Sequence, residues 1–372
     1  FFIFLPFIST IIHFVNKWYL NVMINRYLKM ILQAPVYDVA TITDLDYASG
    51  LSTRLENSVW LKREDTQPVF SYKIRGAYTL MFSLGNKIKN GVIAASAGNH
   101  AQGVAISAKA LEVPATIVMP VTTPNIKIEA VKKLGASVIL HGNSYDDADD
   151  YVNNLVDEQG LIKIPPYDHE QIIAGQGTVG MEILRQMRGK PDIIFVPVGG
   201  GGLIAGVAAY VKAISPSTKV IGVEPEEAAS MKQALEFGKP VRLEKVGIFS
   251  DGAAVKRVGN LTFEVVKEHV DSILTVSIDE ICAAIKDVFE DTRTILEPAG
   301  ALSLAGLKQY VGDSNPKGLN LVAICSGSNI NFDRLRHVAE LAELGERREV
   351  LVGATIPEKP GSFREFCAAL GP

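Results

Sequence analysis

Residues 192–212 read DIIFVPVGGGGLIAGVAAYVK, and this stretch decides the fold. An uninterrupted apolar run ends in four consecutive glycines, and a helical apolar pattern begins at about Leu203. A strand that is apolar at every position is typical of a parallel sheet covered on both faces. Glycines before a helix can turn backbone N–H groups toward one point with no Cβ in the way. The stretch therefore predicts a buried strand, a phosphate-binding loop and a helix.

A flexible turn is the alternative interpretation of this loop, which consists of Gly199, Gly200, Gly201 and Gly202. Four glycines cost conformational entropy, which favours close approach to a ligand. The loop is not a Walker loop, because no Lys followed by Ser or Thr comes after it. A second motif, GQGTVG at 175–180, matches G-x-G-x-x-G but lies inside a helical pattern with no buried strand before it. It predicts helix-packing or hinge glycines rather than a dinucleotide site.

Outward from this stretch, short apolar runs alternate with helical patterns. GVIAAS precedes GNHAQGVAISAKAL, KVIGVEP precedes AASMKQALEFG, and ILTVS precedes EICAAIKDVFEDTR. This alternation predicts an α/β protein with open, mostly parallel twisted sheets. The core, roughly residues 34–345, is too long for one domain, so we expect two lobes with a cleft between them.

Composition and charge exclude several classes of protein. The 372 residues are 47% hydrophobic and 21% charged, with 41 acidic and 37 basic side chains giving a formal charge of −4. No long run of one sign is present, so a nucleic-acid partner is not expected. The three cysteines show neither a CxxC pair nor a zinc spacing. They are typical of reduced thiols in a cytoplasmic protein, and we predict no metal ligands.

Both ends of the sequence differ from the core. Residues 1–30 begin FFIFLPFISTIIHFV, an apolar run too short to span a membrane and without the features of a signal peptide. We expect a mis-set start or a non-native extension, with Met23 or Met30 as true starts; a targeting segment and a surface helix are the alternatives. Residues 347–372 restart with a strand and a helix, which cannot bury a core alone.

Three further stretches carry candidate chemistry. In SYKIRGAY, Ser71 is expected to cap a helix and Lys73 to lie in its first turn, where positive potential lowers the pKa of an amine that must act as a nucleophile or base. In SAGNHAQG, the amides of a strand-to-helix turn can hold a carboxylate while Asn99 faces a ring oxygen. In CSGSN, Ser326 emerges at the C-terminal edge of a strand, where ligands collect. A surface lysine and an ordinary N-cap are the alternatives for the first two.

Five motifs in this order, SYKIRGAY, ASAGNHAQG, VGGGGL, EPAGAL and CSGSN, closely resemble the fold-type-II pyridoxal-phosphate enzymes, and most of all the biosynthetic threonine dehydratases (threonine ammonia-lyases). The resemblance covers about residue 31 to the end. It implies a catalytic domain over 31–346 and the truncated start of an ACT-like regulatory domain over 347–372. It departs at Tyr72, where Phe is more usual, and at Ser328, where a smaller residue is common.

The resemblance also implies the site. Lys73 holds pyridoxal 5'-phosphate as a Schiff base and acts as the catalytic base. The other cofactor contacts it implies are Asn99 at the ring hydroxyl, Ser326 at the pyridine nitrogen, and Gly199, Gly200, Gly201, Gly202 and Leu203 at the phosphate. The substrate carboxylate is held by Ser96, Ala97, Gly98, Asn99 and His100. A cation near Glu224 is only weakly indicated, because Ser230 stands where a metal-binding relative offers Asp.

The resemblance implies deamination of L-threonine by β-elimination of water to give 2-oxobutanoate and ammonia, the first step of isoleucine biosynthesis, with L-serine as a second substrate. It implies a homo-oligomeric, dimeric or tetrameric, cytoplasmic enzyme with no membrane partner. A catabolic serine/threonine dehydratase or another fold-type-II enzyme is the rival within the fold. An NAD-dependent oxidoreductase and a non-catalytic amino-acid sensor are the rivals outside it. Isoleucine is expected to act as an effector only with a complete regulatory domain.

Overall fold

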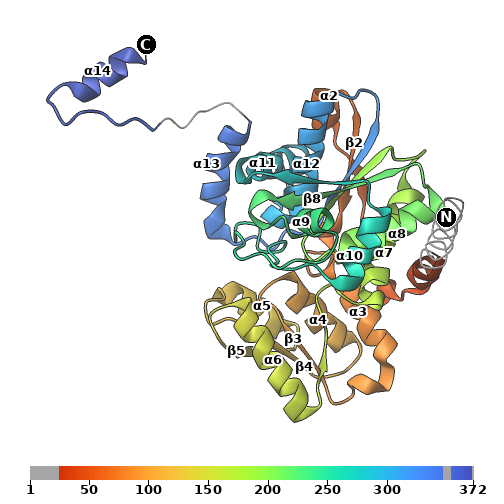
Figure 1. Cartoon of the computed structure of the whole chain (residues 1–372). Coiled ribbons are helices and arrows are strands. Elements are labelled where there is room, and N and C mark those ends of the chain that lie inside the picture. Colours follow the sequence, from red (N-terminus) through yellow and green to blue (C-terminus); the bar gives the residue numbers. More distant parts are fainter. Residues whose placement is uncertain (1–24, 347–352, 371–372) are drawn as a thin grey trace, which may run out of the picture.

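The computed structural model describes residues 25–346 and 353–370 and shows two lobes, each built on its own sheet (Figure 1). The large lobe has six strands in the order β1-β2-β10-β7-β8-β9, all parallel except β1. The small lobe has four parallel strands in the order β5-β4-β3-β6. The predicted α/β architecture with two mostly parallel sheets is therefore confirmed.

The strands of the large lobe are β1 (Leu45–Tyr47), β2 (Ser58–Arg63), β7 (Ile193–Pro197), β8 (Lys219–Pro225), β9 (Ser272–Val276) and β10 (Asn320–Cys325). Its helices are α2 (Ser49–Leu55), α3 (Lys73–Leu84), α7 (Glu170–Gln186), α8 (Gly202–Ile214), α9 (Ser230–Phe237), α10 (Asn260–His269), α11 (Ile278–Thr292), α12 (Pro298–Ser314) and α13 (Leu335–Gly345). The small lobe comprises β3 (Val92–Ala95), α4 (Asn99–Ala110), β4 (Ala115–Met119), α5 (Asn125–Lys133), β5 (Ser137–Leu140), α6 (Tyr145–Gln159) and β6 (Ile162–Lys163). Short 3-10 helices are η1 (Val36–Asp38), η2 (Glu64–Thr66), η3 (Gly85–Ile88), η4 (Glu226–Ala228) and η5 (Phe332–Arg334).

Strand β10 shows why the central strands are apolar throughout. Val322 and Ile324 pack into the core formed with α7, α8 and α10 on one face of the sheet. Leu321, Ala323 and Cys325 pack into the core formed with α11, α12 and α13 on the other face. Successive side chains of a strand point to opposite faces, so a strand covered on both sides needs apolar residues at every position.

Helix α3 joins the two lobes, since it packs against α4 of the small lobe and α7 of the large lobe. The close packing depends on glycines of the GQGTVG motif. A Cβ at Gly175 would lie 2.6 Å from the Arg75 backbone oxygen, and one at Gly177 would lie 2.9 Å from the Gly206 oxygen. Both glycines lie within α7, so the prediction of helix-packing glycines is confirmed and the dinucleotide alternative is not supported.

The two ends of the described chain differ from the sequence-based boundaries. Residues 25–33 form a helix, and Tyr27 is 5% exposed within the large-lobe core. The packed body therefore begins before residue 31. At the other end, the predicted strand falls partly on residues 347–352, outside the described residues, and residues 353–361 contain no strand. The predicted helix is present as α14 (Ser362–Ala369), which has no buried residue. No helix within the described residues is long and apolar enough to cross a membrane.

Candidate active site

Lys73 is the first residue of α3, in the first helical turn as predicted. Its Nζ donates a hydrogen bond to the Pro166 backbone oxygen at 3.0 Å. Burial lowers the pKa of Lys73 to about 8, against the opposing effect of the negative charge of Glu297. An amine with this pKa is about half in its neutral form, able to act as a nucleophile or base, near pH 8, whereas a surface lysine is almost wholly protonated there. The sequence argument had attributed the shift to the helix terminus, whereas the larger cause in the structure is loss of solvent.

The predicted role of Ser71 as a helix cap is wrong. Tyr72 is the N-cap of α3 and makes no side-chain capping bond. The Ser71 backbone instead forms a bridge to Gly327, and its fully buried Oγ has no hydrogen-bond partner within the described residues. A buried hydroxyl without a partner is costly, so one beside the reactive lysine indicates that a polar ligand group completes the site.

The glycine loop lies between β7 and α8, as predicted, with the helix beginning one residue earlier, at Gly202. Gly201 has φ +94°, a conformation that side chains rarely adopt. A Cβ at Gly200 would lie 2.2 Å from the Tyr167 ring. The first N–H groups of a helix have no partner inside it, so the loop and the start of α8 offer donors to an anion.

The SAGNHAQG turn runs from the end of β3 into α4. The Ser96 Oγ accepts from the backbone N–H groups of Gly98 at 3.2 Å and Ala101 at 3.3 Å, which holds the turn in shape. The His100 ring is buried against the Ile164 backbone oxygen at 2.8 Å. Burial, with the positive charge of Lys73, lowers the pKa of His100 to about 3, so the ring is neutral and any contact with a carboxylate comes from its backbone.

Ser326 follows the last residue of β10, at the C-terminal edge where the sequence placed it. It is 4% exposed, and its Oγ is 3.3 Å from the Ala299 backbone oxygen. The Tyr72 N–H donates to the Ser326 backbone oxygen at 3.3 Å, which ties the end of β10 to the start of α3 beside Lys73. The structure thus brings Ser326 and Lys73 together although 253 positions separate them in the sequence.

Glu297 and Asn329, to which the sequence alone assigned no role, belong to the same site. The Asn99 Nδ2 donates to the Glu297 Oε1 at 2.5 Å, and the Asn329 Nδ2 donates to the Asn99 Oδ1 at 2.6 Å. Glu297 lies in EPAGAL and Asn329 in CSGSN, two of the stretches that carry the family resemblance. The signal that could have marked Glu297 was an acid in an otherwise apolar segment.

A buried ion network supports α3 behind Lys73. The Arg75 guanidinium is fully buried and pairs with Glu64 at 2.8 Å and Glu182 at 2.6 Å. The Lys62 ammonium, also fully buried, pairs with Glu182 at 2.6 Å. Two positive and two negative charges thus balance in the core, and Arg75 anchors the helix that starts at Lys73.

The described residues contain no cluster of acids, histidines and cysteines able to hold a metal ion. The Glu224 carboxylate is fully buried and accepts from the N–H groups of Met231 at 2.7 Å and Lys232 at 2.9 Å. Burial raises its pKa to about 7. Glu224 therefore satisfies the start of α9.

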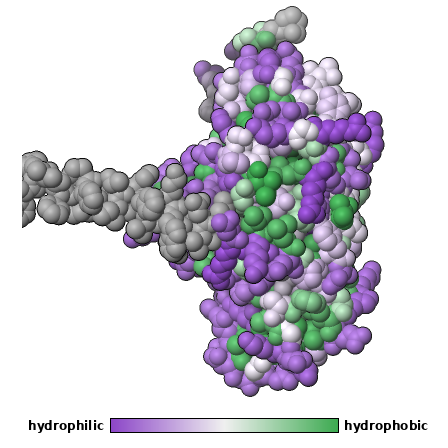
Figure 2. Space-filling model, turned by 90° about the vertical axis from the view of Figure 1, so that its right-hand side faces the viewer, coloured by the Kyte–Doolittle hydropathy of each residue, from purple (hydrophilic) through white to green (hydrophobic). Residues whose placement is uncertain are grey.

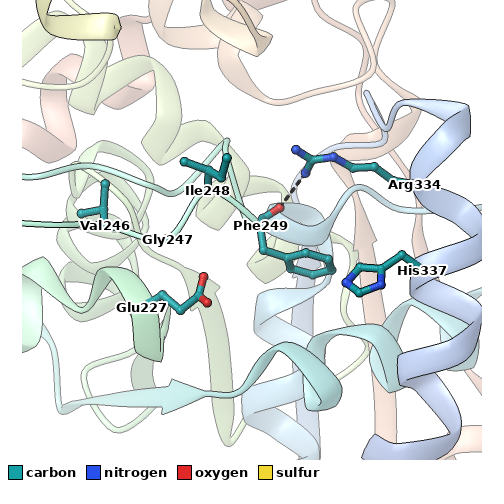
Figure 3. A pocket seen from close by; sticks show the side chains of 7 residues that line it. All are labelled: Glu227, Val246, Gly247, Ile248, Phe249, Arg334 and His337. Carbon is teal, nitrogen blue, oxygen red and sulfur yellow. Dashed lines mark hydrogen bonds between the residues drawn. The ribbon is translucent and has the colours of Figure 1, made fainter.

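A surface hollow of about 660 Å³ lies away from these residues. It is lined by η4, the loop 246–249, η5 and α13, and no predicted cofactor residue lines it (Figure 3). The Arg334 Nη1 donates to the Phe249 backbone oxygen at 2.9 Å, and the Phe249 and His337 rings meet edge to face. The polar groups of this hollow therefore hold the 246–249 loop against α13. The candidate catalytic residues are those around Lys73.

The residues around Lys73 fit pyridoxal phosphate. The amine can bind the aldehyde, the glycine loop offers N–H groups to a phosphate, and the Ser326 hydroxyl can face a ring nitrogen. The Asn99 Nδ2 keeps one N–H for a ring oxygen, because only one is used by Glu297. The unpartnered Ser71 hydroxyl is a further donor at the same place.

Comparisons with known proteins agree with this donor set. The family described as pyridoxal-phosphate dependent enzyme matches residues 36–327. The chain is 55% identical to a chloroplastic biosynthetic threonine dehydratase of Arabidopsis thaliana over 93% of its own length and 59% of the relative's. It is 52% identical to the biosynthetic L-threonine dehydratase of Escherichia coli K12, over 93% of this chain and 67% of the relative. The chain thus spans about three fifths of the plant relative's length.

Among solved structures, the processed form of threonine deaminase isoform 2 from Solanum lycopersicum matches with a TM-score of 0.85 and 49% identity, over 87% of this chain and 89% of that one. The family match covers the Lys73, Asn99 and glycine-loop stretches together and includes Ser326. The chain belongs to the pyridoxal-phosphate-dependent enzyme family and, within it, to the biosynthetic threonine dehydratases.

Proposed function

We propose that this chain converts L-threonine to 2-oxobutanoate and ammonia, the first step of isoleucine biosynthesis, with L-serine as a second substrate. The observation that carries the proposal is the Lys73 amine. It lies at the start of α3 with its pKa lowered to about 8 and donates to the Pro166 backbone oxygen, and the preceding Tyr72 N–H binds the Ser326 backbone oxygen. The relatives' names support threonine as the substrate.

Lys73 is the residue to which we assign proton transfer. As a neutral amine it removes the proton from the substrate Cα, and as an ammonium it returns a proton to the departing β-hydroxyl. Pyridoxal phosphate, when bound, supplies the electron sink for the charge left on Cα. The Ser326 hydroxyl is neutral and, unlike a carboxylate, does not enforce protonation of the ring nitrogen, which favours elimination over prolonged delocalisation.

The substrate carboxylate is assigned to the turn formed by Ser96, Ala97, Gly98, Asn99 and His100. Backbone N–H groups at the start of α4 suit an anion, and they are fixed by the bonds to the Ser96 Oγ. The test is direct: purified protein should show a visible absorbance band that changes when threonine is added, and 2-oxobutanoate should accumulate. A protein without that band would match the sensor or oxidoreductase alternatives instead.

Elimination is predicted to exceed racemisation by a factor of at least ~100, the usual contribution of one positioned acid or base. The family resemblance implies that Ala97 stands where a racemising enzyme would carry a serine able to act as a second acid, opposite Lys73. Without that hydroxyl, no second acid reprotonates Cα from that side. Chiral analysis of the amino acids remaining after partial turnover measures this ratio. D-threonine, D-allothreonine or D-serine formed as fast as keto acid would contradict the assignment.

We also propose that isoleucine has little effect on the polypeptide printed here. Within residues 353–370 the only helix, α14, buries no residue, and the hollow lined by Ile356, Lys359 and Phe363 is formed by side chains at the surface, so this segment offers no enclosed site for an effector. An effector shifts an equilibrium only through different affinities for two states. Threonine kinetics across an isoleucine titration should therefore stay hyperbolic, and strong sigmoidal inhibition would place an effector site in the catalytic lobes.

We propose that the chain forms a homo-oligomer in the cytoplasm. The observation that supports the oligomer is the exposed apolar surface. Figure 2 shows apolar side chains gathered on one face of the molecule. Large hydrophobic side chains with 40% or more of their surface exposed include Leu32, Tyr37, Ile42, Tyr47 and Phe82. Exposed apolar surface is typical of contacts between protein copies. Light scattering of the purified chain measures the mass.

A further inference from the structure

Glu297 is a buried acid where the two lobes meet. It directly precedes α12 of the large lobe and is 4% exposed. Its Oε1 accepts a hydrogen bond of 2.5 Å from the Nδ2 of Asn99, the first residue of α4 in the small lobe. The bond thus links the large lobe to the turn, residues 96–100, that is assigned to the substrate carboxylate.

Asn329 closes a circuit of hydrogen bonds around this contact. Its Nδ2 donates to the Asn99 Oδ1 at 2.6 Å and to the Val69 backbone oxygen at 2.9 Å. Its backbone N–H also binds the Glu297 carboxyl. An ionised carboxylate only accepts, so it can satisfy both the Asn99 amide and the Asn329 N–H, and the Asn99 amide is held in one orientation.

The carboxyl is also enclosed by backbone. A Cβ at Gly327 would lie 2.5 Å from the Glu297 Oε1, and one at Gly252 would lie 3.5 Å from the same atom. Close backbone on both sides prevents the carboxyl from turning away from Asn99. A longer or shorter side chain at position 297 could not keep the same contact.

Charged and polar groups from several segments act on Glu297. Burial first, and then the negative charge of Asp251, raise its pKa to about 7, against the opposing effects of the Asn99 bond, Lys127 and the Asn329 N–H. Lys127 of α5 pairs with Asp251 at 2.8 Å, so the two partly cancel. The negative charge of Glu297 in turn favours the charged form of Lys73 and disfavours ionisation of Tyr72 at the start of α3.

We propose that Glu297 is a positioning residue, whose ionised carboxylate fixes the Asn99 amide across the two lobes and thereby orients the cofactor-facing N–H of Asn99 and the substrate-binding turn. This inference deepens the proposed function and rests on it for the substrate. The expected effect of Glu297 on cofactor affinity does not depend on which amino acid is the substrate.

Deprotonation of the Glu297 carboxyl is expected to have opposite effects on catalytic activity and on the stability of the fold. Below about pH 7 the carboxyl takes up a proton, one oxygen becomes a donor, and a donor on Asn99 or Asn329 loses its acceptor. The part of the catalytic activity that depends on the ionised Glu297 carboxylate should therefore fall as the pH drops. The folded-state pKa is raised above its ordinary value, so the group's contribution to stability is present at low pH and is lost as the pH rises through about 7.

Glu297→Gln tests the proposal, because glutamine keeps the shape but presents an NH₂ group to one of the two donors. In the variant, kcat/KM for threonine above pH 8 should fall by ~100-fold, the cost of a misplacement of about 1 Å. The acid limb of the kcat/KM profile near pH 7 should disappear. Titration of the apoenzyme with pyridoxal phosphate, followed by absorbance, should show affinity reduced by about tenfold, the effect of one lost hydrogen bond.

Two comparisons make the result specific. Glu224→Gln is the matched control, since Glu224 is another buried acid whose pKa is raised to about 7, and it should lower the Tm without changing the pH profile or cofactor affinity. Asn99→Ala should lower cofactor affinity at least as much as Glu297→Gln does, and the double variant should be no worse than Asn99→Ala alone, because Glu297 acts through Asn99. If one of the single variants does not fold, the cofactor titration of the other single variant still tests the contact.

An unchanged acid limb and unchanged cofactor affinity in Glu297→Gln would overturn the proposal, as would additive effects in the double variant. Failure of the proposed function looks different. In that case the wild-type protein would release no 2-oxobutanoate from threonine, while the apoenzyme titrations of the two variants would still show the loss of affinity.

Discussion

Lys73→Ala should lower threonine turnover by at least ~10³-fold, because one side chain both binds the cofactor and moves the α-proton, and a positioned base alone contributes 10²–10⁴-fold. The visible band of covalently bound cofactor should be lost as well. Removal of the amine should not unfold the protein. It is buried, its pKa is lowered by that burial, and its hydrogen bond is to the Pro166 backbone oxygen.

Lys212→Ala is the matched control for this experiment. Lys212 is also partly buried, at 16% side-chain exposure, and pairs with Asp271, but it lies on α8 away from the glycine loop. Its replacement should leave the cofactor band and turnover near those of the wild type. Addition of a small primary amine should restore part of the activity of Lys73→Ala. Turnover within tenfold of wild type in Lys73→Ala would exclude the assignment of Lys73.

Arg75→Ala is expected to destabilise the protein by about 3–5 kcal/mol, the cost of breaking a buried ion pair by removing one partner. Lys62 and Arg75 balance Glu64 and Glu182, so the variant keeps one positive charge against two negative charges in the core. Arg75 lies two residues after Lys73, but its complete burial makes it unsuitable as a neutral control for that residue.

Urea unfolding of the apoenzyme measures this effect, with Arg336→Ala as the control. Arg336 is 89% exposed in an i,i+4 pair with Glu340, and such pairs contribute about 0–1 kcal/mol. The cofactor affinity of Arg75→Ala should also fall, because Arg75 anchors the helix whose first residue is Lys73. A loss of stability below about 1 kcal/mol would mean that water or a shifted side chain replaces the guanidinium.

The elements were predictable where local pattern and burial agree. Strands β7 and β10 are apolar at nearly every position because both faces of the sheet are covered, and this pattern is visible in DIIFVPV and NLVAIC. The glycine loop was predictable for a similar reason, since its requirement for residues without Cβ is local. Chain ends were less predictable: Tyr27 belongs to the core, although the motifs that carry the family resemblance all lie after it in the sequence.

Local sequence pattern gave the wrong prediction where a residue contacts segments that are distant in the sequence. Ser71 precedes a helix and so resembled a cap, but the bridge to Gly327 fixes it in another orientation. The pKa of Lys73 was expected to be lowered by the helix terminus, whereas its main cause is burial beneath segments far away in the sequence.

By itself, the sequence determined the α/β class, the strand-loop-helix arrangement around the four glycines and the candidate residues, because backbone geometry and apolar periodicity depend on neighbouring residues. Only the tertiary structure decided that Glu297 holds Asn99, 198 positions away, and that Arg75 is neutralised by two buried acids. These contacts depend on which faces of separate helices and strands come together. The protonation of a buried group depends on the solvent and charges that this packing leaves around it.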